Sequence, residues 1–288
     1  MNYPINLMLN NNLNCYIQIT KTLIMVDTDE YATIGNSYME IANHSLNKCN
    51  INNNENIIKF VNITSYNTKR IINIEPLSNY MKILQEQAAE DNKNIAIHDN
   101  FKFSLLEILT DQRVRMYFDI ENIPRDNKEM IYEIIDKIYE IMNLKNIQRH
   151  KNYALTFNNN SHHKGLSYHL FLPIRSTKTD ICNFIKLFNF RTDYKYVNMI
   201  DYRVYGNNRL FRTVGSKCPS LNSSTPRIQE DYHKLIKGEL ADTVIQNYNK
   251  LDTIFRCKIS PTLDYYFNER INEVNSQLSN EIKTALFY

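Results

Sequence analysis

The order of hydrophobic patterns between about residues 100 and 220 constrains the fold of this chain more than any other feature of its sequence. Four stretches have the pattern of β-strands: 114–120, 152–158, 166–172 and 197–204. Two stretches, 130–142 and 181–188, instead repeat their apolar residues about every 3.6 positions, which is the helical pattern. The sequence therefore predicts the order strand, helix, strand, strand, helix, strand.

That order is the split βαβ arrangement of ferredoxin-like and RNA-recognition-type folds. In this arrangement the first and third strands are central, the fourth flanks the first, and both helices cover one face. We expect the opposite face to stay open for a ligand. The helices should be capped by Asp126 or Asn127 and by Ser176 or Thr179. Pro173 should close the third strand, and residues 209–214 should form a fifth.

The whole chain is predicted to be an α+β protein of three parts. Residues 1–99 form an N-terminal α/β module, with strands expected at Cys15–Ile19 and Thr22–Val26 and a helix at Leu77–Ala89. Residues 100–225 form the RNA-recognition-like (split βαβ) module. Residues 226–288 are expected to be a C-terminal helical segment, with helices at Leu240–Tyr248 and Leu263–Leu286.

Composition excludes several classes of protein. The 288 residues are 43% hydrophobic and 23% charged, which is typical of a globular chain. No apolar run is long enough for a membrane span and no signal peptide is evident, so we expect a soluble intracellular protein that is not secreted. The five scattered cysteines predict neither a disulfide framework nor a zinc site. None of the five glycines opens a P-loop, which excludes that class of ATPase.

The stretch R-M-Y-F-D-I-E-N-I-P, residues 115–124, carries two acids on one predicted strand. Alternation directs one set of side chains toward the helices: Val114, Met116, Phe118 and Ile120. The other set faces away from them: Arg113, Arg115, Tyr117, Asp119 and Glu121. Two carboxylates roughly 6–7 Å apart repel unless a cation lies between them. The pattern favours a divalent ion such as Mg²⁺ or Mn²⁺, although two solvated acids paired with Arg113 and Arg115 would also fit.

Polar residues on the neighbouring strands fall on the same predicted face. Ser167 and His169 share one side of the third strand, and both types of side chain can hydrogen-bond phosphate oxygens. Asp201 on the fourth strand would supply a third carboxylate to a two-metal site. The alternatives are a half-buried strand histidine at position 169 and a simple ion pair between Asp201 and Arg203.

A basic cluster follows directly on the predicted acidic strand. It contains Arg209, Arg212 and Lys217, and Lys164 lies in the hairpin before the third strand. Arginine forks and lysine point charges both bind phosphate groups. The net charge of +3 is too small to indicate nucleic-acid binding by itself, so this local cluster has to carry that prediction. A solvated basic loop is the alternative.

These motifs together resemble the archaeo-eukaryotic primase superfamily. D-I-E, S-Y-H, M-I-D and R-L-F-R-T-V-G-S-K occur in the order and on the predicted strands typical of that family. The resemblance covers about residues 100–220 and is strongest to the primase-polymerase branch, as found in large DNA viruses. It implies an RNA-recognition-like catalytic module joined to an N-terminal α/β module, with the active site between them.

The resemblance also implies a role for each motif. Asp119, Glu121 and Asp201 would bind two divalent ions, Mg²⁺ or Mn²⁺. The phosphates of the incoming nucleotide would be contacted by Ser167, His169, Arg212 and Lys217, and Lys164 lies one place from a family lysine. Arg209 is a further candidate for nucleotide binding through the basic cluster alone. The implied activity is primer synthesis on a single-stranded DNA template from nucleoside triphosphates.

Further partners follow from the same resemblance and from the predicted open face. The template would contact Arg113, Arg115 and Tyr117, with Lys69 and Arg70 as further candidates, through charge and aromatic stacking. A replicative helicase would act in trans or within a longer chain, in the host cytoplasm or nucleus if the protein is viral.

Two other functions stay open at the level of sequence. A metal-dependent nuclease could use the same acids for two-metal hydrolysis. A non-catalytic nucleic-acid-binding module is the third possibility, although this chain has acids where RNA-recognition folds usually have stacking aromatic residues.

Overall fold

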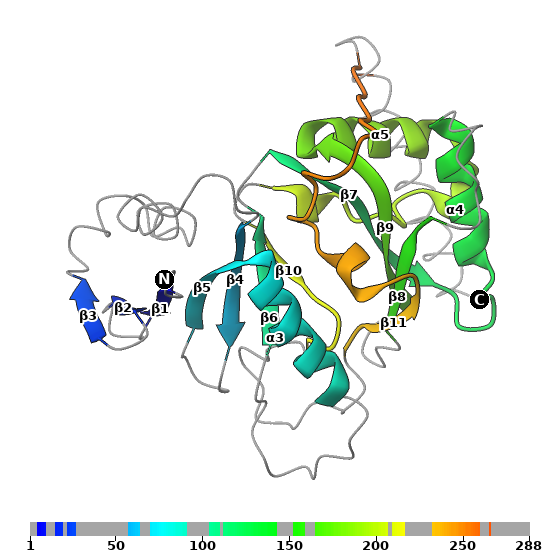
Figure 1. Cartoon of the computed structure of the whole chain (residues 1–288). Coiled ribbons are helices and arrows are strands. Elements are labelled where there is room, and N and C mark those ends of the chain that lie inside the picture. The colour runs from blue at the N-terminus through cyan, green and yellow to red at the C-terminus, as the bar shows by residue number, and fades with distance from the viewer. Residues whose placement is uncertain are drawn as a thin grey trace, which may run out of the picture.

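The chain folds into an α+β structure built around antiparallel sheets (Figure 1). The structure is a computed structural model, and it describes residues 5–9, 15–19, 22–26, 57–63, 70–90, 104–109, 112–142, 152–158, 165–206, 209–216, 232–259 and 265. Three α-helices lie in these ranges, and none has the length and hydrophobicity that crossing a membrane requires.

The first sheet has the strand order β10-β6-β4-β5-β1-β2-β3, and all of its neighbouring strands are antiparallel. The strands are β1 (Ile5–Leu9), β2 (Cys15–Ile19), β3 (Thr22–Val26), β4 (Ile57–Ile63), β5 (Arg70–Pro76), β6 (Ser104–Leu109) and β10 (Arg209–Arg212). Helix α3 (Leu77–Glu90) follows β5 directly, and its Tyr80 ring packs 4.8 Å from that of Phe60. The predictions of β2, β3 and α3 are confirmed.

The second sheet has the order β11-β8-β9-β7. Its strands are β7 (Arg113–Ile123), β8 (Ala154–Asn158), β9 (Leu166–Thr177) and β11 (Lys234–Lys237). Helices α4 (Met130–Ile141) and α5 (Lys178–Arg191) lie beside it, on the side away from α3 (Figure 1). The predicted apolar residues of both helices are buried except Ile141, which is partly buried, and the Phe118 ring of β7 lies 5.6 Å from that of Phe184 in α5. Alternation along β7 therefore predicted the helix-facing side correctly.

The structure contradicts the fourth predicted strand, 197–204. The chain instead turns after the 3₁₀-helix η1 (Tyr194–Tyr196), where Asn198 has a positive φ, and enters a second 3₁₀-helix, η2 (Tyr202–Tyr205), which Asp201 caps. A single bridge joins Ile200 to Ile120 of β7. This segment nevertheless runs beside β7, since Asp201 N donates to Asp119 O over 2.8 Å.

The predicted helix caps and the end of the third strand were also wrong. Helix α5 is capped by Thr177, whose hydroxyl accepts a hydrogen bond from Asp180 N, and α4 begins after Glu129 without a side-chain cap. Strand β9 continues beyond Pro173, because the β7–β9 register shifts at this point and absorbs a residue that cannot donate to the ladder.

The C-terminal part is less helical than predicted. Within 240–248 only Leu240–Thr243 is helical, as the 3₁₀-helix η3, and the predicted helix Leu263–Leu286 lies outside the described residues apart from Tyr265. We call residues 239–250 the connecting segment, because its backbone bonds to both sheets. Ile245 N donates to Glu107 of β6, and Ile245 O accepts from Arg115 N of β7.

The face of the second sheet opposite its helices is not open along its whole length. Phe211 of β10, a strand of the first sheet, lies 4.8 Å from the ring of Tyr117 and 4.4 Å from that of His169. Contacts between the two sheets therefore fill part of the face that we expected to be exposed.

Candidate metal and nucleotide site

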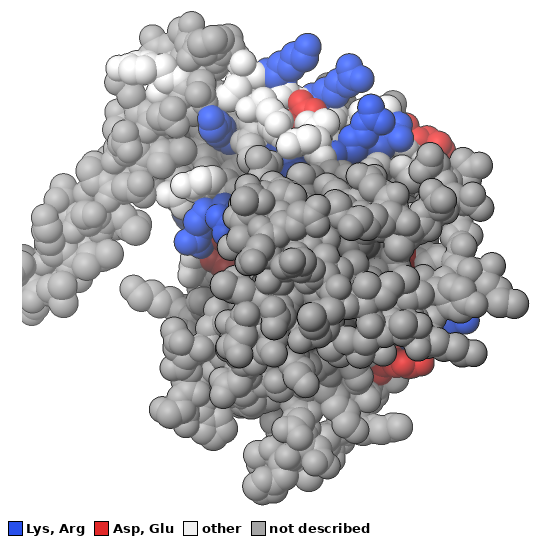
Figure 2. Space-filling model, turned by 90° about the vertical axis from the view of Figure 1, so that its left-hand side faces the viewer, with Lys and Arg blue, Asp and Glu red and all other residues white. Residues whose placement is uncertain are grey.

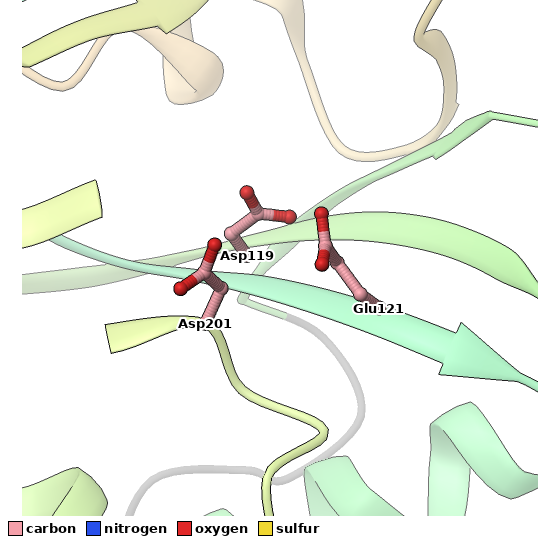
Figure 3. A group of neighbouring side chains, drawn as sticks. All are labelled: Asp119, Glu121 and Asp201. Carbon is pink, nitrogen blue, oxygen red and sulfur yellow. The ribbon is translucent and has the colours of Figure 1, made fainter. Parts of the chain in front are cut away.

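Three carboxylates meet where β7 and the segment before η2 run side by side. Asp119 and Glu121 lie two residues apart on β7 and so project from the same face. Backbone hydrogen bonds between β7 and residues 199–201 bring Asp201 beside them. One oxygen from each side chain lies within 4.8 Å of the others (Figure 3). The predicted convergence of Asp119, Glu121 and Asp201 is therefore present.

Electrostatics within this triad favour a bound cation. Oδ1 of Asp119 is buried and has no hydrogen-bond partner among the described residues. Burial, together with the charges of Glu121 and Asp201, raises the pKa of Asp119 to about 8, although Arg212 and Arg203 oppose this shift. A positive ion between the carboxylates would offset both the burial and the repulsion. Three carboxylate oxygens also suit the hard ions Mg²⁺ and Mn²⁺, so the residues fit such a metal.

The ion pair that the sequence offered as an alternative is also present. Arg203 Nε lies 2.8 Å from Oδ1 of Asp201, and its guanidinium also approaches Glu121 at 3.9 Å. The Arg203 side chain is 68% exposed, whereas that of Asp201 is only 12% exposed. Convergence of the three acids and pairing of Asp201 with Arg203 therefore coexist in one site.

His169 lies next to the carboxylates, as predicted from the strand order. It is the register partner of Asp119, and its Nε2 lies 3.7 Å from Asp119 Oδ1. Burial and the nearby Arg212 hold the pKa of His169 well below its ordinary value, so the ring is neutral. Ser167, two residues earlier on β9, is buried on the same side of the strand. The arrangement provides a neutral imidazole and a hydroxyl beside the acids.

The predicted basic cluster is divided by the structure. Arg212 is half-buried on β10, and its charge acts on both Asp119 and His169. Arg209 is exposed at the start of the same strand. Because Arg209 and Arg212 are three positions apart on one strand, their side chains lie on opposite faces. Lys164 and Lys217 lie outside the described residues.

The prediction that Arg115 and Tyr117 are available to nucleic acid is wrong. Tyr117 is 0% exposed, and its hydroxyl donates to Val204 O over 3.2 Å. Arg115 is 4% exposed, and its guanidinium binds both the carbonyl and the carboxylate of Asp242 in the connecting segment. Both side chains are covered because the first sheet and the connecting segment pack over this part of β7. Arg113 is exposed as expected, whereas Lys69 lies outside the described residues and the side chain of Arg70 is not described.

His233 is a residue of this site that the sequence did not indicate. Its ring stacks on that of His169, with centroids 3.5 Å apart and planes 19° from parallel. It was missed because we expected residues 226–288 to be helical, whereas β11 begins at Lys234. The short apolar pair Leu235–Ile236, with Gly238 as a turn residue just beyond it, is the signal that could have predicted a short strand here.

Basic side chains mark one part of the described surface. Figure 2 shows Lys and Arg gathered along the upper edge of this face, with fewer acidic side chains among them. Such a surface suits a polyanionic partner.

The sequence was compared with protein-family models and with curated proteins. It matches no protein-family model, and no curated protein matches it either. The function of the chain therefore has to be inferred from its own residues.

Proposed function

We propose that this chain is a DNA primase or primase-polymerase of the archaeo-eukaryotic primase superfamily. It would synthesise primers on single-stranded DNA from NTPs or dNTPs during DNA replication. The observation that carries the proposal is the convergence of Asp119, Glu121 and Asp201 within 4.8 Å. His169 opposite Asp119 and the charge of Arg212 add the groups that a triphosphate needs.

The sheet topology supports the finer assignment to an RNA-recognition-like module. Strand β9 lies between β7 and β8, and the segment at Ile200 bridges to β7. With that segment counted as the fourth strand, the order is fourth, first, third, second, as in the split βαβ arrangement. The proposed active site then lies on the sheet face opposite α4 and α5.

Each group of the site has a proposed task. Two divalent ions, Mg²⁺ or Mn²⁺, held by Asp119, Glu121 and Asp201, would supply activation of a 3′-hydroxyl and neutralisation of charge at the phosphates. The neutral His169 can donate one hydrogen bond to a phosphate oxygen, and the Ser167 hydroxyl a second. Arg212 orients the triphosphate through its charge. Lys164 and Lys217 join this group by their place in the sequence, whereas Arg209 lies on the opposite face of β10 from Arg212.

The partners are a single-stranded template, nucleoside triphosphates and a replicative helicase, in trans or in a longer chain. Arg113 remains the template contact that the fold allows, and the basic edge in Figure 2 offers further backbone contacts. Binding through phosphate charges should weaken as salt rises. A soluble enzyme working in the host cytoplasm or nucleus, if viral, fits this role.

Primer synthesis by matched variants tests the proposal. Wild-type protein, Asp119→Asn and Glu121→Ala are incubated with a single-stranded template, labelled NTPs or dNTPs, and Mg²⁺ or Mn²⁺. Wild type should produce new oligomers and both variants none. Asp136→Asn, a matched change of an exposed acid on α4, should synthesise like wild type. Oligomers from Asp119→Asn at the wild-type rate would refute the assignment.

The same acidic triad would also suit a two-metal nuclease. Labelled template separates the two activities in the same reactions. A nuclease shortens the template whether or not triphosphates are present, whereas a primase extends new chains only when they are supplied. Tight DNA binding without metal dependence or chemistry would instead favour a non-catalytic replication module.

A further inference from the structure

His233 is held in place by both sheets. It directly precedes β11, which pairs with β8 in the second sheet, and its carbonyl accepts a 2.9 Å hydrogen bond from Gly215 N, just beyond β10 of the first. The side chain is fully buried. None of the primase-like motifs contains this residue, and it comes from a part of the chain far in sequence from β9.

The His233 ring belongs to a closed cluster with two residues of the second sheet. Its Nδ1 lies 3.1 Å from Oγ1 of Thr156, and Thr156 is the register partner of His169. Thr156 therefore fixes the rotation of the His233 ring, while His233 stacks on the His169 ring at 3.5 Å. His169 is in turn the residue opposite Asp119. The cluster thus extends from β8 to the carboxylates.

We propose that His233 is a positioning residue, which fixes the imidazole plane of His169 so that His169 can bind a nucleoside triphosphate. This inference rests on the proposed function. The two rings lie face to face, with their planes 19° from parallel. A flat ring at position 233 is therefore the property that matters.

One feature of His233 suggests a different role that must be tested. Its Nε2 is buried and has no hydrogen-bond partner among the described residues. Such atoms are rare in folded proteins. A ligand that bound this nitrogen directly would make His233 a contact residue, for which a phenylalanine could not substitute.

Three variants separate these roles: His233→Phe, which keeps a flat ring, His233→Leu, which fills the space without one, and Thr156→Val. The first readout is the set of imidazole ¹⁵N and ¹³C NMR shifts of His169 in histidine-labelled protein. The second is the dissociation constant of ATP and dATP with Mn²⁺. We expect His233→Leu to move the His169 shifts and weaken nucleotide binding roughly ten-fold. His233→Phe should keep the wild-type His169 shifts and the wild-type nucleotide affinity. Thr156→Val should give values between those of wild type and His233→Leu.

Each outcome decides the inference. His169 shifts that are unchanged in a folded His233→Leu protein overturn it, and so does equal loss of nucleotide affinity in the Phe and Leu variants. If His233→Leu does not fold, unchanged His169 shifts in Thr156→Val overturn it instead. If wild type binds neither nucleotide, the proposed function fails, while the His169 shifts still decide whether His233 positions that ring.

Discussion

Arg203 lies against both carboxylate oxygens of Asp201, at 2.8 Å from Oδ1 and 2.9 Å from Oδ2. One cationic side chain thus neutralises the acid that we assign to a metal site, and it reaches toward Glu121 as well. Because the Arg203 side chain is mostly exposed, it can leave the site at little cost. It therefore competes with an incoming metal ion for Asp201.

Replacing this competitor should tighten metal binding. Arg203→Gln is expected to lower the dissociation constant for Mn²⁺ by up to about fivefold, because an exposed ion pair is worth about 0–1 kcal/mol. Isothermal titration of metal into the protein measures the change. Arg191→Gln removes the same charge from the exposed end of α5 and should leave the affinity unaltered. Weaker Mn²⁺ binding by Arg203→Gln would mean that Arg203 assists the site.

Asp119 should couple metal binding to the stability of the fold. A ligand that binds only the folded state raises its melting temperature, so wild type should melt higher in Mn²⁺. Asp119→Asn should lose that increase. Without metal it should melt no lower than wild type, because burial already disfavours the charged carboxylate. Thermal unfolding with and without Mn²⁺ tests both statements, and a full metal-dependent increase in the variant would contradict them.

Glu107 should make stability depend on pH. Burial raises its pKa from 4.5 to about 7, against the opposing effect of hydrogen bonds from the backbone N–H groups of Ile245 and Gln246. Because the folded pKa is the higher one, the folded state holds the proton more tightly, and stability falls as pH rises from about 4.5 to 7. Over this pH range the contribution of Glu107 to the free energy of unfolding falls by about 3 kcal/mol.

Urea unfolding at pH 5 and pH 8 measures this contribution. Glu107→Gln cannot ionise, so its stability relative to wild type should be higher at pH 8 than at pH 5. Glu86→Gln, at an exposed position of α3, should show the same pH dependence as wild type. A Glu107→Gln protein whose pH dependence also matches wild type would show that Glu107 has an ordinary pKa.

Arg115 should stabilise the contact between β7 and the connecting segment. Arg115→Met removes two hydrogen bonds to Asp242 and is expected to lower the free energy of unfolding by about 1–3 kcal/mol. Arg113→Met makes the same change at the exposed start of the same strand and should cost less than about 0.5 kcal/mol. Denaturant unfolding compares the two variants. Equal losses would mean that the contact with Asp242 contributes nothing.

Local sequence patterns correctly predicted the elements that are determined by residues close together in the chain. The alternation along β7 separated Phe118, which faces α5, from Asp119 and Glu121, and the helical period predicted the buried side of α5. Asp201 was correctly predicted to lie beside β7, but the prediction assumed that residues 197–204 form a strand. The segment is not a strand, yet its backbone bonds to β7 as a flanking strand would.

The remaining errors arise from contacts between distant parts of the chain. Arg115 was expected to be exposed, but its partner Asp242 lies 127 residues further along the sequence. Residues 245 and 246 do not continue the helix predicted at 240–248, because their backbone N–H groups donate hydrogen bonds to Glu107 of β6 in the first sheet. His233 reaches His169 through β11, whose pairing with β8 no local pattern specifies.

The most direct test of the central claim is synthesis by wild type and by Asp201→Asn on an unprimed single-stranded template with Mn²⁺ and triphosphates, with Mn²⁺ affinity measured on the same samples. We predict new oligomers and Mn²⁺ binding for wild type, and loss of both for Asp201→Asn in a protein that remains folded. Oligomers made by Asp201→Asn at the wild-type rate, or wild type that binds Mn²⁺ yet only shortens the template, would contradict it.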